Sequence, residues 1–270
     1  IQFRGATACK NACDKSGKGF WWEEAEDMGS GVGGDGVMKA VRFLLILLLF
    51  AACRKQETKT EPAFYYWKTT YSHSPFLSQF LKDLKIKKLY LRFFDVDWNN
   101  EQSEAMPVGE LHFNSAPDTA LAIVPVVYIT NKTFEQITAP QTEQLAQHIY
   151  NKVHTMAGDQ HISFFELQLD CDWTEGTREK YFQLIRVLKE RLHASGKRIS
   201  VTVRLHQVKY PSRTGIPEAD HGMLMFYNMG QLQSHQRRNS IYNEQDAGKY
   251  TAFIQKYPLH LDVVLPCFSW

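Results

Sequence analysis

The chain has 270 residues, a formal net charge of +2, 44% hydrophobic residues and 13% aromatic residues. A charge this close to neutral gives no indication of a nucleic-acid partner, because domains that bind nucleic acids carry a strong basic excess. Cys171 and Cys267 lie in apolar, strand-like runs without metal-ligand spacing. They indicate buried thiols and argue against a metal site or a disulfide framework.

The first 37 residues have neither helical nor strand periodicity and include a glycine-rich run. The chain begins with Ile1, whereas Met38 stands directly before a segment that has the features of a protein start. We therefore expect residues 1–37 to be upstream translated sequence, disordered and outside the folded domain.

Residues 38–53 show the order of parts of a secretory signal peptide: a basic start, the apolar run FLLILLLF and the small-residue end Ala-Ala-Cys. The run is too short to span a membrane, which takes about 20 residues. The end resembles the bacterial lipobox, in which the cysteine is acylated, although Phe50 stands where leucine is usual. The resemblance implies a lipid anchor on Cys53 and a location at the bacterial cell envelope, with the domain on the periplasmic or extracellular side. An ordinary signal peptide with an incidental cysteine is the alternative.

Residues 54–62 are polar and unpatterned, as flexible tethers are, and residues 63–270 are long enough for one sizeable core. Runs rich in β-branched and aromatic residues predict seven strands, at residues 64–70, 88–95, 121–130, 164–172, 199–206, 223–228 and 261–269. Apolar residues at helical spacing lie between several of them, at residues 76–84, 145–153 and 181–192.

Alternating strands and helices predict an α/β fold with a parallel sheet, and seven strands in about 200 residues predict a (β/α)8 barrel of the TIM type. The segment between Asp97 and Leu121 departs from the alternation and reads as a long loop with a small hairpin near residues 111–113. Because one strand is missing from the count, we expect a barrel that is truncated before its eighth strand.

The fourth predicted strand carries four polar residues that alternate with apolar ones: Glu166, Gln168, Asp170 and Asp172. Successive side chains of a strand point to opposite faces, so these four share one face. In a barrel the apolar face packs on helices, which places the polar face in the lumen, with Asp172 nearest the rim. Asp170 and Asp172 are two positions apart on this face, so their charges interact. One of the two carboxyl groups then holds a proton more tightly, as acid–base catalysis requires.

The fifth predicted strand offers a matching polar face that includes Arg204 and His206. A buried Asp170–Arg204 ion pair with a purely structural role is therefore an alternative for Asp170. His206 is a weaker candidate, either as a proton shuttle or as part of a hydrogen-bond network. Asp95 and Asp97 lie at the end of the second predicted strand. They are either ligand-binding residues at the rim or caps of the following loop.

The segments LQLDCDW (residues 167–173) and REKYFQLIRVLKERL (178–192) resemble the fourth strand and helix of glycoside hydrolase family 18. This family comprises chitinases and endo-β-N-acetylglucosaminidases, and its strand reads Asp-x-x-Asp-x-Asp-x-Glu. Residues 225–228 (MFYN) are similar to its sixth-strand Met-Thr-Tyr-Asp, and residues 265–268 (LPCF) to its seventh-strand Leu-Pro-Phe-Tyr. The resemblance covers most of the domain.

In register, the family's acid glutamate falls on Asp172, the aspartate before it on Asp170, the next on Gln168 and the first on Phe165. The family's third-strand Ser-x-Gly-Gly is absent. An aspartate would hold its proton about 1.5 Å further back than a glutamate, and a misplacement of that size can lower the rate by two orders of magnitude.

The resemblance thus implies one of two functions. In a glycoside hydrolase, Asp172 would be the proton donor and Asp170 its electrostatic partner. In a non-catalytic envelope protein, the barrel would bind glycans or have a structural role. Whether the protein is an enzyme stays open at this point.

The expected glycan contacts come from Tyr227, Asn228, Gln168, Arg204 and Trp270. Trp67, Trp98 and Trp173 also lie near strand ends, where tryptophans either stack on sugars or belong to the core. Motifs for zincins, phosphate loops and serine hydrolases are absent from the domain, so we expect neither a cofactor nor a metal. The expected partners are a glycan and, through Cys53, a membrane.

Overall fold

The computed structural model describes residues 2–4, 60–229 and 241–267, which belong to one compact unit. The predicted signal peptide, Cys53 and Trp270 lie outside the described residues, as do all of residues 1–37 except positions 2–4. Within the described part of the chain, the helices are too short or too polar to cross a membrane.

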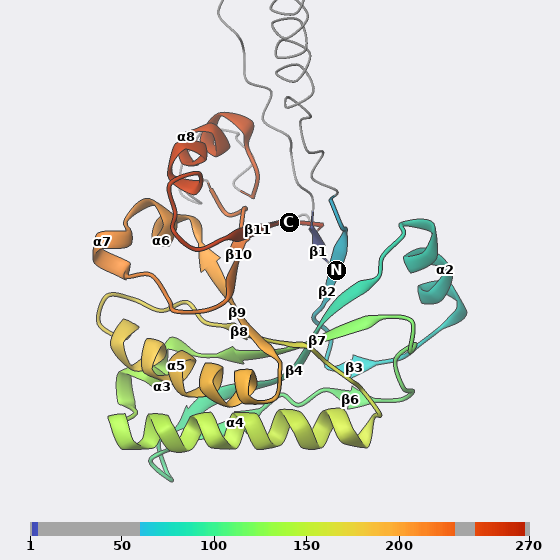
Figure 1. Cartoon of the computed structure of the whole chain (residues 1–270), viewed down its shortest axis with the longest axis horizontal. Coiled ribbons are helices and arrows are strands. Elements are labelled where there is room, and N and C mark those ends of the chain that lie inside the picture. The colour runs from blue at the N-terminus through green and yellow to red at the C-terminus, as the bar shows by residue number, and fades with distance from the viewer. Residues whose placement is uncertain (1, 5–59, 230–240, 268–270) are drawn as a thin grey trace, which may run out of the picture. The chain divides into compact units, whose positions relative to one another are not determined.

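The described residues form a sheet whose centre is a run of seven parallel strands (Figure 1). In their order around the sheet, the strands are β2 (Ala63–Tyr66), β4 (Lys88–Asn99), β7 (Ala122–Ile129), β8 (Glu166–Asp170), β9 (Arg198–Arg204), β10 (His221–Met225) and β11 (Leu261–Leu265). Sequence order equals spatial order, and helices fill most of the connections. This is the arrangement of a (β/α)8 barrel with seven parallel strands, and it confirms the predicted fold class.

A short strand, β1 (Gln2–Arg4), pairs antiparallel with both β2 and β11. It therefore lies between the first and the last of the parallel strands. We expected residues 1–37 to lie outside the folded domain, and these three residues instead belong to the sheet.

The predicted helices are present as α2 (Pro75–Asp83), α4 (Ala139–Asp159) and α5 (Arg178–Ala194). α2 begins where Ser74 Oγ accepts a hydrogen bond from the Leu77 backbone N–H at 3.1 Å, with a proline as its first residue. α4 and α5 lie side by side (Figure 1). Shorter helices complete the connections: α3 (Asn131–Gln136), α6 (Leu205–Lys209), α7 (Pro211–Thr214) and α8 (Glu244–Ile254). Because α6 begins at Leu205, His206 is helical and does not extend the fifth parallel strand as predicted.

The segment that we predicted as a long loop contains two strands. β5 (Glu104–Val108) forms an antiparallel hairpin with the end of β4, which continues beyond the predicted strand. β6 (His112–Phe113) pairs parallel with β3 (Thr70–Tyr71) in a separate small sheet. The hairpin expected near residues 111–113 was therefore misplaced: the free edge of the extended β4 pairs with β5 instead.

The apolar core fills the space between the sheet and the helices. Its members include Trp173, Tyr181 and Cys171, none of which is accessible to solvent. Cys171 is thus a buried thiol as predicted, whereas Cys267 is exposed because it follows the end of β11.

The buried face of α5 gives a test of this packing. Leu184, Leu188 and Leu192 recur at helical spacing and are fully buried. Leu188→Ala should lower the free energy of unfolding by about 2–5 kcal/mol, because it leaves a cavity. Arg191→Ala, on the exposed face of the same helix, should change it by no more than about 0.5 kcal/mol. Denaturant unfolding measures both, and equal effects would contradict the assignment of the buried face.

Candidate functional site

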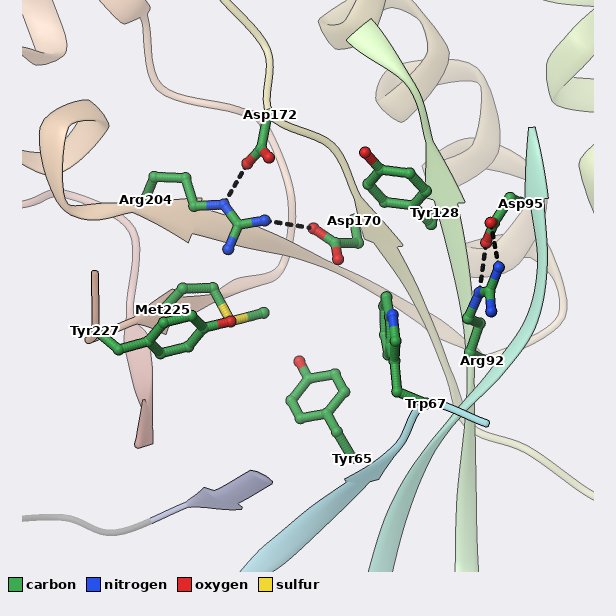
Figure 2. A pocket seen from close by; sticks show the side chains of 10 residues that line it. All are labelled: Tyr65, Trp67, Arg92, Asp95, Tyr128, Asp170, Asp172, Arg204, Met225 and Tyr227. Carbon is green, nitrogen blue, oxygen red and sulfur yellow. Dashed lines mark hydrogen bonds and ion pairs between the residues drawn. The ribbon is translucent and has the colours of Figure 1, made fainter. Parts of the chain in front are cut away.

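A pocket of about 470 Å³ opens where the parallel strands end (Figure 2). Strands β2, β4, β7, β8, β9 and β10, with the residues directly after them, supply its lining: Tyr65, Trp67, Arg92, Asp95, Tyr128, Asp170, Asp172, Arg204, Met225 and Tyr227. Binding sites of (β/α)8 barrels lie at this face, because the loops that follow the strands converge there.

The polar column of β8 has the order that its alternation predicted. Glu166, Gln168 and Asp170 are buried, and the Asp172 side chain after the strand is 51% exposed. Asp170 and Asp172 line the pocket, whereas Gln168 and Glu166 lie further toward the start of β8. The carboxylates that the sequence analysis selected therefore meet in one cavity.

Arg204 lies between these two carboxylates (Figure 2). Its Nη2 is 3.6 Å from Asp170 Oδ1, and its Nε donates a hydrogen bond to Asp172 Oδ1. Asp170 Oδ1 also accepts a hydrogen bond from Thr202 Oγ1 at 2.6 Å. The Asp170–Arg204 pair that we considered as an alternative is thus present, and Asp172 shares the same guanidinium, which we did not predict.

The pKa shifts follow from burial and from this pairing. Burial raises the pKa of Asp170, against the opposing effects of the Arg204 charge and the Thr202 hydrogen bond. Burial disfavours the Arg204 cation, but both carboxylates outweigh that effect and raise its pKa above the ordinary value. Asp172 is engaged as an acceptor of a guanidinium hydrogen bond, so in this arrangement it is not poised to donate a proton.

A second ion pair, Arg92–Asp95, lies on the opposite side of the pocket (Figure 2). Arg92 Nε donates to Asp95 Oδ1 at 2.6 Å. The register between β4 and β7 shifts between Arg92 and Phe94, and such a bulge lets residues three apart share one face. Gly109 packs against this pair: its φ is +57°, and a Cβ there would lie 2.9 Å from Arg92 Nη2.

Aromatic side chains form the remaining wall. Trp67 is 40% exposed, and the centroid of its ring lies 5.9 Å from Arg92 Cζ. Tyr65 meets Trp67 edge to face, with ring centroids 6.0 Å apart. Tyr227 also lines the pocket, and its hydroxyl donates to Met225 Sδ at 3.4 Å. An exposed tryptophan beside paired polar groups suits ligands that have both apolar and hydroxyl-bearing surfaces.

Several predicted site residues lie elsewhere. Asn228 is exposed and turned away by a left-handed backbone with φ +55°, and its N–H donates to Ile241 O at 2.7 Å. Asp97 lies within β4, and its Oδ1 accepts a hydrogen bond from Thr130 Oγ1 at 2.7 Å. Gln168 lies beneath the pocket.

Two of the tryptophans belong to the core. Trp173 is fully buried and donates to Thr214 O at 2.9 Å, and Trp98 packs against the core outside the pocket. Conversely, we did not select Arg92, Tyr65, Tyr128 and Met225, which do line the pocket. Tyr65, Tyr128 and Met225 lie in predicted strands, but the sequence analysis did not assign the faces of these strands.

At the other end of the lumen, Glu166 is held by a set of donors. His221 Nε2 lies 3.2 Å and Lys88 Nζ 3.7 Å from the carboxylate, and Ser200 Oγ donates to it at 2.7 Å. Burial alone would raise the pKa of Glu166, but these hydrogen bonds and charges outweigh it and lower the pKa to about 2.

This lowered pKa predicts how stability depends on pH. With a value of 4.5 in the unfolded chain and about 2 in the fold, Glu166 contributes roughly 3 kcal/mol that is fully present above pH 4.5 and is lost as the pH falls toward 2. In Glu166→Gln, the free energy of unfolding should fall less between pH 4.5 and pH 2 than in the wild type, as measured by urea unfolding at a series of pH values. Glu218→Gln, at an exposed ion pair, is the control. If the free energy of unfolding of Glu166→Gln falls with pH as in the wild type, Glu166 is not the source of this pH dependence.

No protein-family profile and no curated protein matches the sequence. Among solved structures, the chain is similar to a chitinase from Chromobacterium violaceum, with 14% identity over 73% of this chain and 65% of that chain and a TM-score of 0.44. It is similar to the spore cortex-lytic enzyme of Bacillus megaterium, with 13% identity over 74% of this chain and 49% of that chain and a TM-score of 0.46. A class V chitinase from Pseudomonas fluorescens gives 12% identity, 66% and 60% coverage and a TM-score of 0.45.

The chain therefore spans between about half and two thirds of the length of the solved structures that it resembles. Two of the three are chitinases, the class of enzyme that the fourth-strand motif resembles. The barrel fold of this chain rests on its own strand order and not on these similarities. At identities this low, the likeness assigns no activity to this chain.

Proposed function

We propose that the barrel binds a carbohydrate in the pocket at the ends of its strands. The observation that carries this proposal is the position of Arg204, which pairs with both Asp170 and Asp172. That pairing converts a potential acid–base pair into a fixed set of hydrogen-bonding groups. Beside it, the exposed Trp67 offers a ring face on which the C–H face of a sugar can stack.

The charges of the pocket indicate what kind of glycan fits. The lining contains two guanidinium groups and three carboxyl groups, and each guanidinium is already paired with a carboxylate. A site with this balance has no unpaired cation for an anionic sugar. It favours a neutral glycan that is recognised through its hydroxyl and amide groups.

Hydrolysis is the second candidate, because Asp170 and Asp172 lie together in the pocket and glycosidases use a pair of neighbouring carboxyl groups. In that reaction Asp172 would be the proton donor and Asp170 its electrostatic partner. Arg204 would then have to release Asp172 when the substrate binds.

A glycan-array screen and a hydrolysis screen, both with chito-oligosaccharides included, separate the two candidates. The wild type should bind a glycan without cleaving it, and Asp172→Asn should keep the affinity within a few-fold. Arg204→Gln should lose at least about tenfold, because it leaves two carboxylates without their shared partner. Arg213→Gln, at an exposed ion pair, is the matched control.

The alternative outcomes are distinct. Cleavage by the wild type that disappears in Asp172→Asn would establish the hydrolase, and cleavage that persists would place the chemistry at other residues. If the wild type neither binds nor cleaves any glycan, both carbohydrate functions are refuted.

We also propose that a lipid on Cys53 anchors the protein at a bacterial envelope membrane, with the domain on the periplasmic or extracellular side. The support is the sequence of residues 38–53, in which a short apolar run precedes Ala-Ala-Cys. Several acyl chains on one cysteine hold a protein firmly, whereas a single chain binds only marginally.

Cys53→Ser should therefore release the protein from the membrane fraction of bacterial cells. Cys267→Ser, which changes an exposed cysteine of the domain, should leave it there. Fractionation followed by immunoblotting gives the answer, and membrane association that survives Cys53→Ser would rule out the anchor.

A further inference from the structure

A chain of buried hydrogen bonds runs through the barrel lumen beneath the pocket. The Tyr65 hydroxyl donates to Gln168 Oε1, Gln168 Nε2 donates to Ser200 Oγ at 3.2 Å, and Ser200 Oγ donates to Glu166 Oε1 at 2.7 Å. These residues are at most 3% exposed. The chain thus links a tyrosine that lines the pocket to a carboxylate at the far end of the lumen.

The far end is held in one ionisation state. Lys88, Arg198 and His221 approach the Glu166 carboxylate from β4, β9 and β10, at 3.7, 3.9 and 3.2 Å. Tyr90 of β4 adds a hydroxyl donor at 3.4 Å. Every neighbour on these three strands is a cation or a donor, so the carboxylate acts only as an acceptor.

An acceptor at that end sets the direction of every bond in the chain. Ser200 has one hydroxyl proton and donates it to Glu166, so it offers only lone pairs to Gln168. The amide of Gln168 therefore turns its NH2 group to Ser200 and its carbonyl oxygen to Tyr65. The Tyr65 hydroxyl must in turn donate to that carbonyl, and only its lone pairs remain for the pocket.

We infer that Glu166 is a positioning residue for the pocket, which it serves by fixing the Tyr65 hydroxyl as a hydrogen-bond acceptor toward the ligand. The identity of that ligand rests on the proposed carbohydrate function. The inference adds a selectivity: at Tyr65 the pocket takes a group that donates a hydrogen bond, such as a sugar hydroxyl or an acetamido N–H. An ether oxygen at the same place has no proton to donate and is disfavoured.

A purely structural role for Glu166 predicts something different. The Tyr65 ring already stacks on Tyr90, with centroids 4.7 Å apart and an interplanar angle of 23°. Stacking holds the ring in place but leaves the hydroxyl proton free to rotate. The direction of the Tyr65 hydroxyl therefore distinguishes a positioning role of Glu166 from a purely structural one.

The first part of the test needs no ligand. The full-length chain is labelled with [13Cζ]tyrosine, the Tyr65 resonance is assigned with Tyr65→Phe, and its shift is compared between variants. Glu166→Gln lets the new amide donate to Ser200, so the direction of the chain is no longer fixed, and the Tyr65 resonance should move. Ser200→Ala cuts the chain while it keeps the buried charge, and it should have the same effect if Glu166→Gln does not fold. Arg213→Gln, which removes a cation from an exposed ion pair away from the lumen, should leave the resonance in place.

The second part uses triacetylchitotriose and its O-methylated counterpart as probes in calorimetric titrations. The wild type and Arg213→Gln should prefer the free hydroxyl form by about tenfold, and Glu166→Gln and Ser200→Ala should reduce that preference to less than about threefold. A Tyr65 resonance that stays unchanged in both variants, or an unchanged preference, overturns the inference. A resonance that moves in a protein whose wild type binds neither probe supports the positioning and counts against the proposed function for this glycan.

Discussion

The carboxylates along β8 must find partners inside the barrel, and this requirement determines what faces them. A carboxylate removed from water is tolerated only where donors or cations replace its hydration. Glu166 obtains Ser200 and Lys88, and Asp170 obtains Thr202 and Arg204. The polar face of β9 is therefore the complement of the polar face of β8. Between β8 and β9 the lumen is hydrogen-bonded, whereas the outer faces of these two strands pack on helices as apolar core.

The same requirement limits the chemistry of the pocket. An acid catalyst must hold a proton that it can release, while a buried carboxylate is most stable when a cation shares its charge. Arg204 meets the second condition for Asp170 and Asp172 together, and it thereby opposes the first. The combination of aspartate and Arg204 is thus coherent with binding, and it makes hydrolysis conditional on a rearrangement.

The sequence predicts those features that depend on local periodicity. Alternation placed Asp170 and Asp172 on one face of a strand, and helical spacing located α5, because both patterns repeat over many residues. Features that depend on one irregular residue could not be predicted. Arg92 and Asp95 share the pocket only because a bulge shifts the register of β4. Asn228 leaves it because a single left-handed residue turns the chain, which nothing in its neighbours announces.

The two ends of the lumen respond differently to acid, and this separates their roles. Burial raises the pKa of Asp170 at the pocket, whereas donors and cations lower that of Glu166 to about 2. As the pH falls, Asp170 gains its proton first, and the pairing with Arg204 weakens while Glu166 is still ionised. The Tyr65 hydroxyl keeps its direction throughout that interval, because the chain that orients it ends at the carboxylate that titrates last. The direction of the Tyr65 hydroxyl is therefore independent of whether Asp170 is protonated.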